Sequence, residues 1–141
     1  MPGLGAPPAA LRLPLTAEQR SRLRGRRRSA CGRELILQLP RGEALQPGEL
    51  LAPEGAGPLV QVEAAPEALL LVRSPDPLAL LQAAYHLGNR HVALEIRAGE
   101  LCLLDDAVLA TLLAQRGLEL ERRQGPFQPE AGAYGGSHAH G

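Results

Sequence analysis

The first half of the chain alternates short apolar runs with turns. Turn residues such as Pro47 and Gly48 separate four strand-like segments, residues 11–15, 34–39, 49–52 and 59–64. In the second segment, Leu35, Leu37 and Leu39 alternate with three other residues, so this strand is at least half buried. The pattern predicts a small all-β domain over residues 11–67.

The pattern changes after Pro66. An apolar strand at 68–73 precedes a helix with Asp76 as N-cap and Pro77 in its first turn, in which apolar residues recur at helical spacing. Strands at 91–97 and 100–104, a helix capped by Asp105 or Asp106 and a strand at 118–123 follow. This β-α-β-β-α-β order is that of a ferredoxin-like sandwich over residues 68–128, so the predicted fold class is α+β.

Both ends lie outside these domains. Residues 1–10 are rich in Pro, Gly and Ala and are expected to be disordered, and residues 129–141 are expected to form a flexible tail that contains histidine. No apolar run is long enough to span a membrane, and no signal-peptide pattern opens the chain. Cys31 and Cys102 form no CxxC motif and suit a reducing compartment, so we expect a cytoplasmic protein.

Composition excludes several classes of function. The chain of 141 residues has no lysine, which excludes a Walker A loop, a Schiff-base enzyme and a pyridoxal-phosphate site. It also has no HExxH motif and no nucleophile–base pair, so catalysis is not expected. The arginine run at 22–28 lacks aromatic neighbours and the net charge is zero, which argues against nucleic acid. Arg22, Arg26 and Arg27 are instead expected to meet acidic partner proteins.

The most informative segment is residues 85–92, which contains two of the four histidines. His86 is predicted on the last turn of a helix, Gly88 as the left-handed residue just past its end, and His91 as the first residue of the next strand. If Val92 and alternate apolar residues of that strand face the helices, His91 points from the opposite face of the sheet. One imidazole is a poor metal site, but two that meet across a two-fold axis can share a borderline divalent metal ion.

The sequence of this segment is Tyr-His-Leu-Gly-Asn-Arg-His-Val. It resembles the signature of the UreE-type urease accessory proteins, which are the nickel metallochaperones of urease assembly. The resemblance extends to residues 15–20, 39–42, 62–72, 106–118 and 127–135. It implies a homodimer that holds Ni²⁺ between paired histidines of the motif, which assigns His91 as the ligand. It also implies urease apoprotein and accessory proteins, including a GTPase, as partners. Zn²⁺ or Cu²⁺ is expected to compete for the site.

Other candidate ligands are less well defined. His86 suits a helix C-terminus better than a metal site. His138 and His140 form a His-X-His pair that can grip one ion from one side of an extended tail, or can be an unbound end. Ala107 stands where many relatives have a further histidine, which makes a surface metal site there doubtful. The alternative function is a metal-independent adaptor in which the β-domain does the binding.

Overall fold

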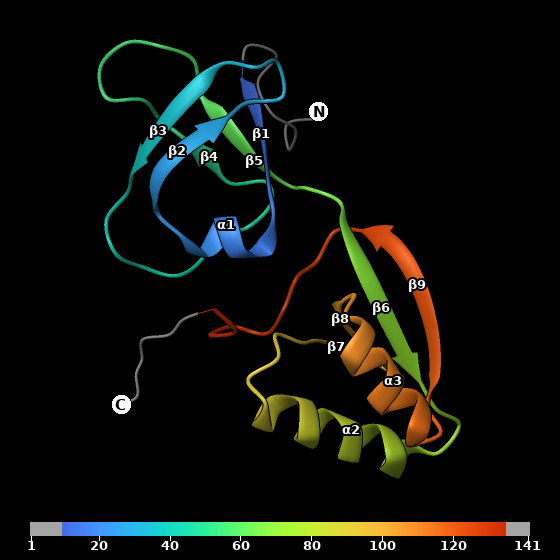
Figure 1. Ribbon diagram of the computed structural model, residues 1–141. Coiled ribbons are helices and arrows are strands. Elements are labelled where there is room, and N and C mark those ends of the chain that lie inside the picture. The colour runs from blue at the N-terminus through green and yellow to red at the C-terminus, as the bar shows by residue number, and fades with distance from the viewer. Residues whose placement is uncertain (1–9, 135–141) are drawn as a thin grey trace. The chain divides into compact units, whose positions relative to one another are not determined.

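The computed structural model describes residues 10–134 and shows a mixed α+β protein in two compact units, Met1–Ala65 and Pro66–Gly141 (Figure 1). The predicted lead at 1–10 lies outside the described residues except for residue 10, as does the predicted tail from residue 135 onward. No helix among residues 10–134 is long and apolar enough to cross a membrane.

The first unit has two small sheets. One has the strand order β1-β5-β4, in which β1 and β5 run parallel, and the other pairs β2 with β3 antiparallel. The side chains that form its core are Leu13, Leu15, Leu37, Leu45 and Val62. In chain order the elements are β1 (Leu11–Leu15), α1 (Ala17–Ser21), β2 (Arg24–Arg28), β3 (Glu34–Gln38), β4 (Leu50–Leu51) and β5 (Val60–Ala64).

The prediction that this unit is all-β is wrong at α1. Thr16 and Gln19 form a capping box, in which the Thr16 hydroxyl accepts from the Gln19 N–H and the Gln19 side chain accepts from the Thr16 N–H. These bonds stabilise one helical turn that is too short to show an apolar period. Strand β2 was also missed, because it lies within the arginine run.

The second unit has one four-stranded antiparallel sheet with the order β7-β8-β6-β9. Its elements follow the predicted order: β6 (Glu67–Arg73), α2 (Pro77–Asn89), β7 (Glu95–Arg97), β8 (Glu100–Leu104), α3 (Ala107–Gln115) and β9 (Glu119–Gly125). Asp76 and Asp106 are the N-caps, and each carboxylate accepts a backbone N–H of the first turn. Leu70 and Val72 of β6 belong to the same buried cluster as Ala83 of α2 and Leu113 of α3.

The predicted boundary between α2 and β7 is wrong. Helix α2 continues through Gly88 to Asn89, and β7 begins at Glu95 rather than at residue 91. The strand argument for His91 therefore fails, and Ile96, expected to face the helices, is 53% exposed. The physical reason is the cap itself, because the residue with positive φ after α2 is His91 and not Gly88.

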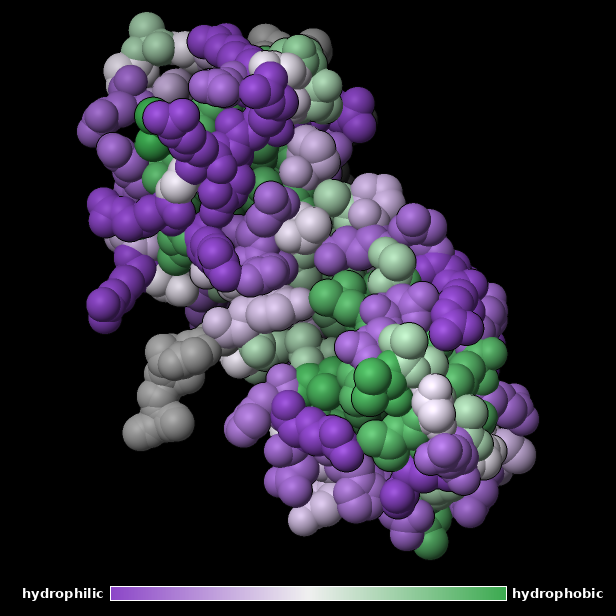
Figure 2. Space-filling view, viewed as in Figure 1, coloured by the Kyte–Doolittle hydropathy of each residue, from purple (hydrophilic) through white to green (hydrophobic). Residues whose placement is uncertain are grey.

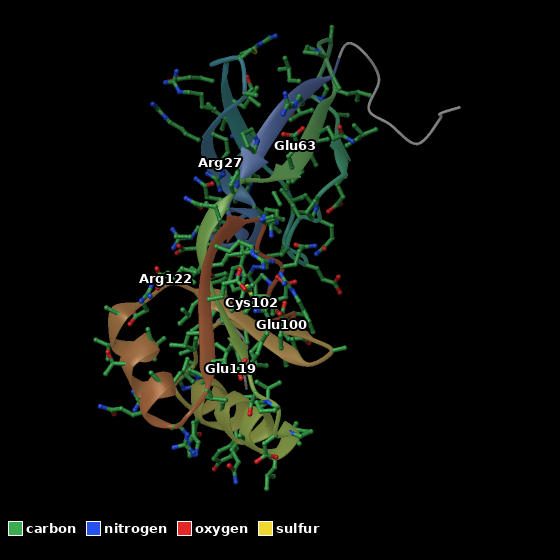
Figure 3. All side chains as sticks on the ribbon, turned by 90° about the vertical axis from the view of Figure 1, so that its right-hand side faces the viewer. Arg27, Glu63, Glu100, Cys102, Glu119 and Arg122 are labelled. Carbon is green, nitrogen blue, oxygen red and sulfur yellow. The ribbon has the colours of Figure 1, made fainter. Side chains whose placement is uncertain are left out.

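The face of this sheet opposite Leu70 and Val72 carries a row of ion pairs. Because successive residues of a strand alternate between faces, Arg73, Glu100 and Cys102 share it. The side chains alternate in charge in the order Glu95, Arg97, Glu100, Arg73, Glu121 and Arg123, with nitrogen–oxygen distances of 2.6–2.8 Å between neighbours. Cys102 is fully buried on the same strand as Glu100 (Figure 3), and burial raises the pKa of its thiol to about 11. It is an inert core residue.

Candidate metal site

His91 occupies the turn that ends α2, and its backbone is left-handed, with φ of 61°. The His91 N–H donates to the Gly88 carbonyl at 2.9 Å, and the Val92 N–H donates to the Leu87 carbonyl at 3.0 Å. With Arg90 as C-cap, these two bonds make a Schellman motif, in which the left-handed position is usually glycine. The position of His91 is therefore fixed by the helix end and not by strand alternation.

The same motif ends α3, and there the left-handed residue is Gly117, with φ of 84°. The Gly117 N–H donates to Ala114 at 2.9 Å and the Leu118 N–H to Leu113 at 3.2 Å. Left-handed backbone costs an L-residue roughly 1–2 kcal/mol, although histidine tolerates it better than most. The chain thus places a histidine after α2, at the position where α3 has the glycine that avoids this cost.

A shallow groove adjoins the His91 side chain. Ala84 and Gly88 of α2 line it together with Leu94, Ile96 and residues 130–133. The Glu130 N–H donates to the Leu94 carbonyl at 2.7 Å, and the Gln128 N–H donates to the Glu95 carboxylate at 2.9 Å. Residues 129–134, which the sequence assigns to the tail, are thereby tied to the segment that follows His91. His91 is exposed at the edge of this groove.

His86 lies on the last turn of α2, as predicted, and is exposed. Its ring stands edge-on to that of Tyr85, with 5.2 Å between the ring centroids. This placement agrees with a helix C-terminal histidine, where a positive charge complements the helix dipole. His138 and His140 lie outside the described residues. Within residues 10–134, no three His, Cys, Asp or Glu side chains come together as a possible metal site.

The two aspartates before α3 have structural partners. Asp106 caps the helix through the Leu109 N–H at 2.9 Å. Asp105 pairs with Arg122 of β9 at 3.1 Å. Ala107, next to them, is the first residue of α3 and is exposed.

The three arginines expected to meet partners differ in their surroundings. Arg26 is exposed, and Arg22 is exposed but pairs with Glu18 one turn away. Arg27 is half-buried, and its guanidinium donates to the Arg26 carbonyl at 2.7 Å and the Arg22 carbonyl at 2.9 Å. The Arg27 side chain therefore ties β2 to the end of α1. On a strand, Arg24 and Arg26 share one face and Arg27 lies on the other. Strand alternation would therefore have indicated Arg24, and not Arg27, as the second exposed arginine.

Comparison with known proteins identifies the family. The C-terminal domain of the UreE urease accessory protein matches residues 67–141, and its N-terminal domain matches residues 4–65. The chain belongs to the UreE family of urease accessory proteins. This is an accessory chaperone family and not a family of enzymes.

Individual relatives match over most of the chain. A urease accessory protein UreE of Parasynechococcus marenigrum (strain WH8102) is 62% identical over 133 residues, which cover 94% of this chain and 88% of the relative. That of Synechococcus sp. (strain WH7805) is 58% identical, over 95% of this chain and 77% of the relative. That of Burkholderia thailandensis is 56% identical, over 78% of this chain and 51% of the relative. The chain therefore has a role in urease assembly.

Proposed function

We propose that this protein is a homodimeric nickel metallochaperone of the cytoplasm that delivers Ni²⁺ to apo-urease, within a complex that includes an accessory GTPase. Ni²⁺ is its cargo and is held between the His91 side chains of two copies. The observation that carries the proposal is the exposed imidazole at a left-handed helix cap, where the equivalent residue of α3 is glycine. Imidazole nitrogen is a preferred donor for Ni²⁺.

A second copy is needed because one imidazole does not make a tight site, and residues 10–134 offer no three-ligand group. The surface of α2 supports such a dimer. Leu78, Leu81 and Tyr85 are 58%, 68% and 66% exposed, and their spacing puts them in one stripe that leads toward Gly88 and the His91 turn. Figure 2 shows hydrophobic residues gathered around the helices of the second unit. Burial of this stripe against its two-fold mate would bring both His91 turns to the interface.

Each unit has its own part in the proposal. The second unit, with its β-α-β-β-α-β order, is a ferredoxin-like metal-binding domain. The first unit binds partner proteins, with Arg22 and Arg26 at its basic surface; Arg27 supports this surface from within. His138 and His140 add imidazoles from the tail and help to complete the coordination of Ni²⁺. Zn²⁺ and Cu²⁺ compete, because the same donors suit them.

Titration calorimetry with Ni²⁺ tests this proposal. Wild type is compared with His91→Ala and with a chain that ends before Ser137. His91→Ala should lose the tightest site, and the shortened chain should keep that site but bind fewer ions or bind more weakly overall. Unchanged tight binding by His91→Ala would contradict the proposal. Absence of any Ni²⁺ binding by wild type would favour the metal-independent adaptor.

A further inference from the structure

Strand β3 has an unpaired edge. Its register with β2 pairs Leu37 with Gly25 and Ile36 with Arg26, and β3 pairs with no other strand of residues 10–134. The Leu39 N–H donates to the Leu23 carbonyl at 3.0 Å, and the Ser29 N–H donates to the Arg33 carbonyl at 2.9 Å. Because bonded and non-bonded pairs alternate in an antiparallel ladder, residues 33, 35, 37 and 39 direct their backbone groups toward β2. Those of Glu34, Ile36 and Gln38 point away from it.

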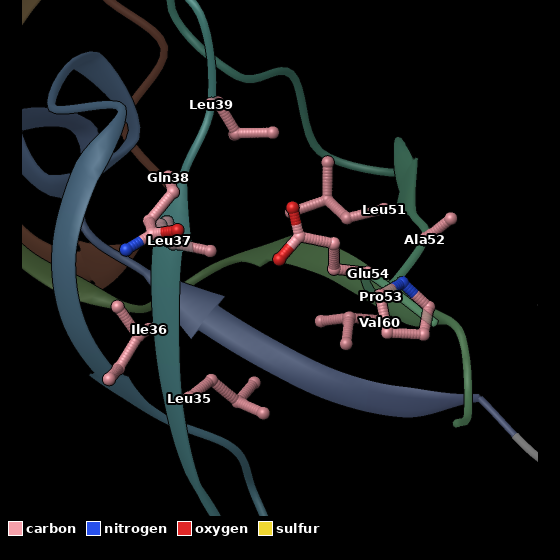
Figure 4. Close-up of a pocket in the computed structure, with 10 residues that line it drawn as sticks. All are labelled: Leu35, Ile36, Leu37, Gln38, Leu39, Leu51, Ala52, Pro53, Glu54 and Val60. Atoms are coloured by element: carbon pink, nitrogen blue, oxygen red, sulfur yellow. The ribbon is translucent and has the colours of Figure 1, made fainter. Parts of the chain in front are cut away.

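A groove of about 390 Å³ lies along this edge (Figure 4). Strand β3 forms one wall, and the other wall comprises Leu51, the segment 52–54 and Val60. Leu35, Leu39, Leu51 and Val60 also pack against the buried core of this unit, so the groove floor is apolar and rigid. Among residues 10–134, the only charged residue that lines it is Glu54, an exposed side chain that can accept a hydrogen bond from an incoming strand.

The usual protections of a strand edge are absent from β3. Native edges are commonly shortened, bulged, interrupted by proline or charged at the centre. Strand β3 has five residues without proline, and its central residue, Ile36, is 68% exposed. An unprotected edge with an exposed β-branched residue beside an apolar groove has the features of a strand-addition site.

The positive charge near the β3 edge favours an added strand with acidic side chains. Alternation places Arg24 and Arg26 on the same outer face as Ile36 and Gln38. Both arginines are exposed, and neither has an ion pair among residues 10–134, whereas Arg28 pairs with Glu34 at 3.2 Å. An added strand would lie about 9.6 Å from β2, which is two strand spacings. An arginine side chain on β2 and a glutamate side chain on the added strand are together long enough to span this distance.

We propose that the free edge of β3 binds an extended segment of a partner protein in which apolar and acidic residues alternate. The apolar side chains enter the groove beside Leu35, Leu39 and Leu51. The acidic side chains lie on the outer face near Arg24 and Arg26, and the backbone pairs with that of Ile36. This site does not depend on metal at His91, so the nickel proposal and this one can fail separately.

The test uses the full chain, labelled with ¹⁵N, and a heptapeptide of alternating valine and glutamate. Amide shifts should concentrate at residues 34–38 and at Leu51, Ala52 and Glu54, and the Ile36 amide should become protected from hydrogen exchange. The same peptide with N-methylated central residues should not bind, because it keeps the side chains but lacks the backbone donors. A valine–lysine heptapeptide should bind at least roughly tenfold more weakly, as charge complementarity requires.

Two protein variants complete the design. Ile36→Pro removes an N–H that β2 does not use, so the fold is kept and peptide binding is lost. Arg24→Glu combined with Arg26→Glu should weaken binding about tenfold, whereas Arg116→Glu, an exposed arginine of the other unit, should not. Equal binding of the N-methylated peptide, or no shifts at residues 34–38 at millimolar peptide, would overturn the proposal. Protection of the Ile36 amide without peptide would also overturn the proposal. If that protection depends on protein concentration, a second copy covers the edge; if it does not, another part of this chain covers it.

Discussion

His91 carries a conformational cost that its counterpart Gly117 avoids. The two helices of the second unit end in the same Schellman motif, with positive φ at both residues. The His91 imidazole is exposed, so core packing does not explain why a side chain is present there. The cost is understandable if the imidazole itself is used, because a cap on a rigid helix end holds a metal ligand in a defined position.

His91→Gly should therefore make the metal-free protein more stable. Relief of the left-handed backbone is expected to raise the free energy of unfolding by about 1 kcal/mol, after allowance for the greater freedom of glycine in the unfolded chain. Urea denaturation of wild type and variant without metal measures the difference. Gly117→His is the reciprocal control and should destabilise by a similar amount. A His91→Gly variant less stable than wild type would show that the imidazole supports the fold.

Arg27 is a structural residue among exposed arginines, and its removal should destabilise the first unit. Its guanidinium satisfies carbonyls of Arg22 and Arg26, and it passes so close to Gly25 that a Cβ there would lie 2.8 Å from its Nη1. Arg27→Ala is expected to lower the free energy of unfolding by about 1–3 kcal/mol, because it leaves backbone acceptors unpaired. Arg26→Ala, on the exposed side of the same strand, should change it by less than about 0.5 kcal/mol. Equal effects of the two variants in thermal denaturation would contradict this assignment.

At the level of elements, the row of ion pairs joins all four strands of the second sheet. Glu100 on β8 accepts from Arg97 on β7 at 2.6 Å and from Arg73 on β6 at 2.8 Å. Burial raises the pKa of Glu100, but the hydrogen bonds from the two arginines outweigh it and leave the pKa below its ordinary value. The pKa of Glu121 on β9 is also lowered, by its hydrogen bonds to Arg73 and Arg123.

The row should make the fold sensitive to acid. A carboxyl whose pKa is lower in the folded state stabilises the protein above the unfolded pKa of 4.5, and this stabilisation is lost as the pH falls through the folded value. Wild type should therefore lose stability between about pH 5 and pH 3, and Glu100→Gln should lose less over the same range. At pH 7 the variant should be less stable by about 1–2 kcal/mol. Parallel stability–pH curves for the two proteins would contradict this role of Glu100.

The sequence predicted those elements whose ends are set by local chemistry. Asp76 was identified as an N-cap, and Asp106 was one of the two residues expected to cap the next helix, because caps act within a few residues. The end of α2 was missed because Asn89 continues the helix after Gly88, Arg90 caps it and a histidine takes the left-handed position. Strand β2 was missed because its half-buried positions are Gly25 and Arg27, which produce no apolar alternation. The prediction of His91 as a metal ligand came from the family signature, and only the structure gave the reason for its position.

For the whole molecule, the proposed dimer depends on the α2 stripe. Leu81 is among its most exposed members, so Leu81→Asp should weaken dimerisation without harm to the core of the monomer. Sedimentation equilibrium should give a dissociation constant raised at least about tenfold. Thr111→Asp, an exposed position on α3, is the matched control and should leave the dimer unchanged. A Leu81→Asp protein that remains as dimeric as the control would place the interface elsewhere.

Native mass spectrometry at neutral pH can show whether two His91 side chains share one Ni²⁺. The chain is shortened after Gly136, so that His138 and His140 make no contribution, and is compared with the same chain carrying His91→Gly. We expect a dimer with one Ni²⁺ for the first protein and a metal-free dimer for the second. The ion should also be released as the medium is made acidic, because protons compete with Ni²⁺ for imidazole nitrogen. A monomer that retains one Ni²⁺, or a His91→Gly dimer that still carries one, would contradict a site shared by two His91 side chains.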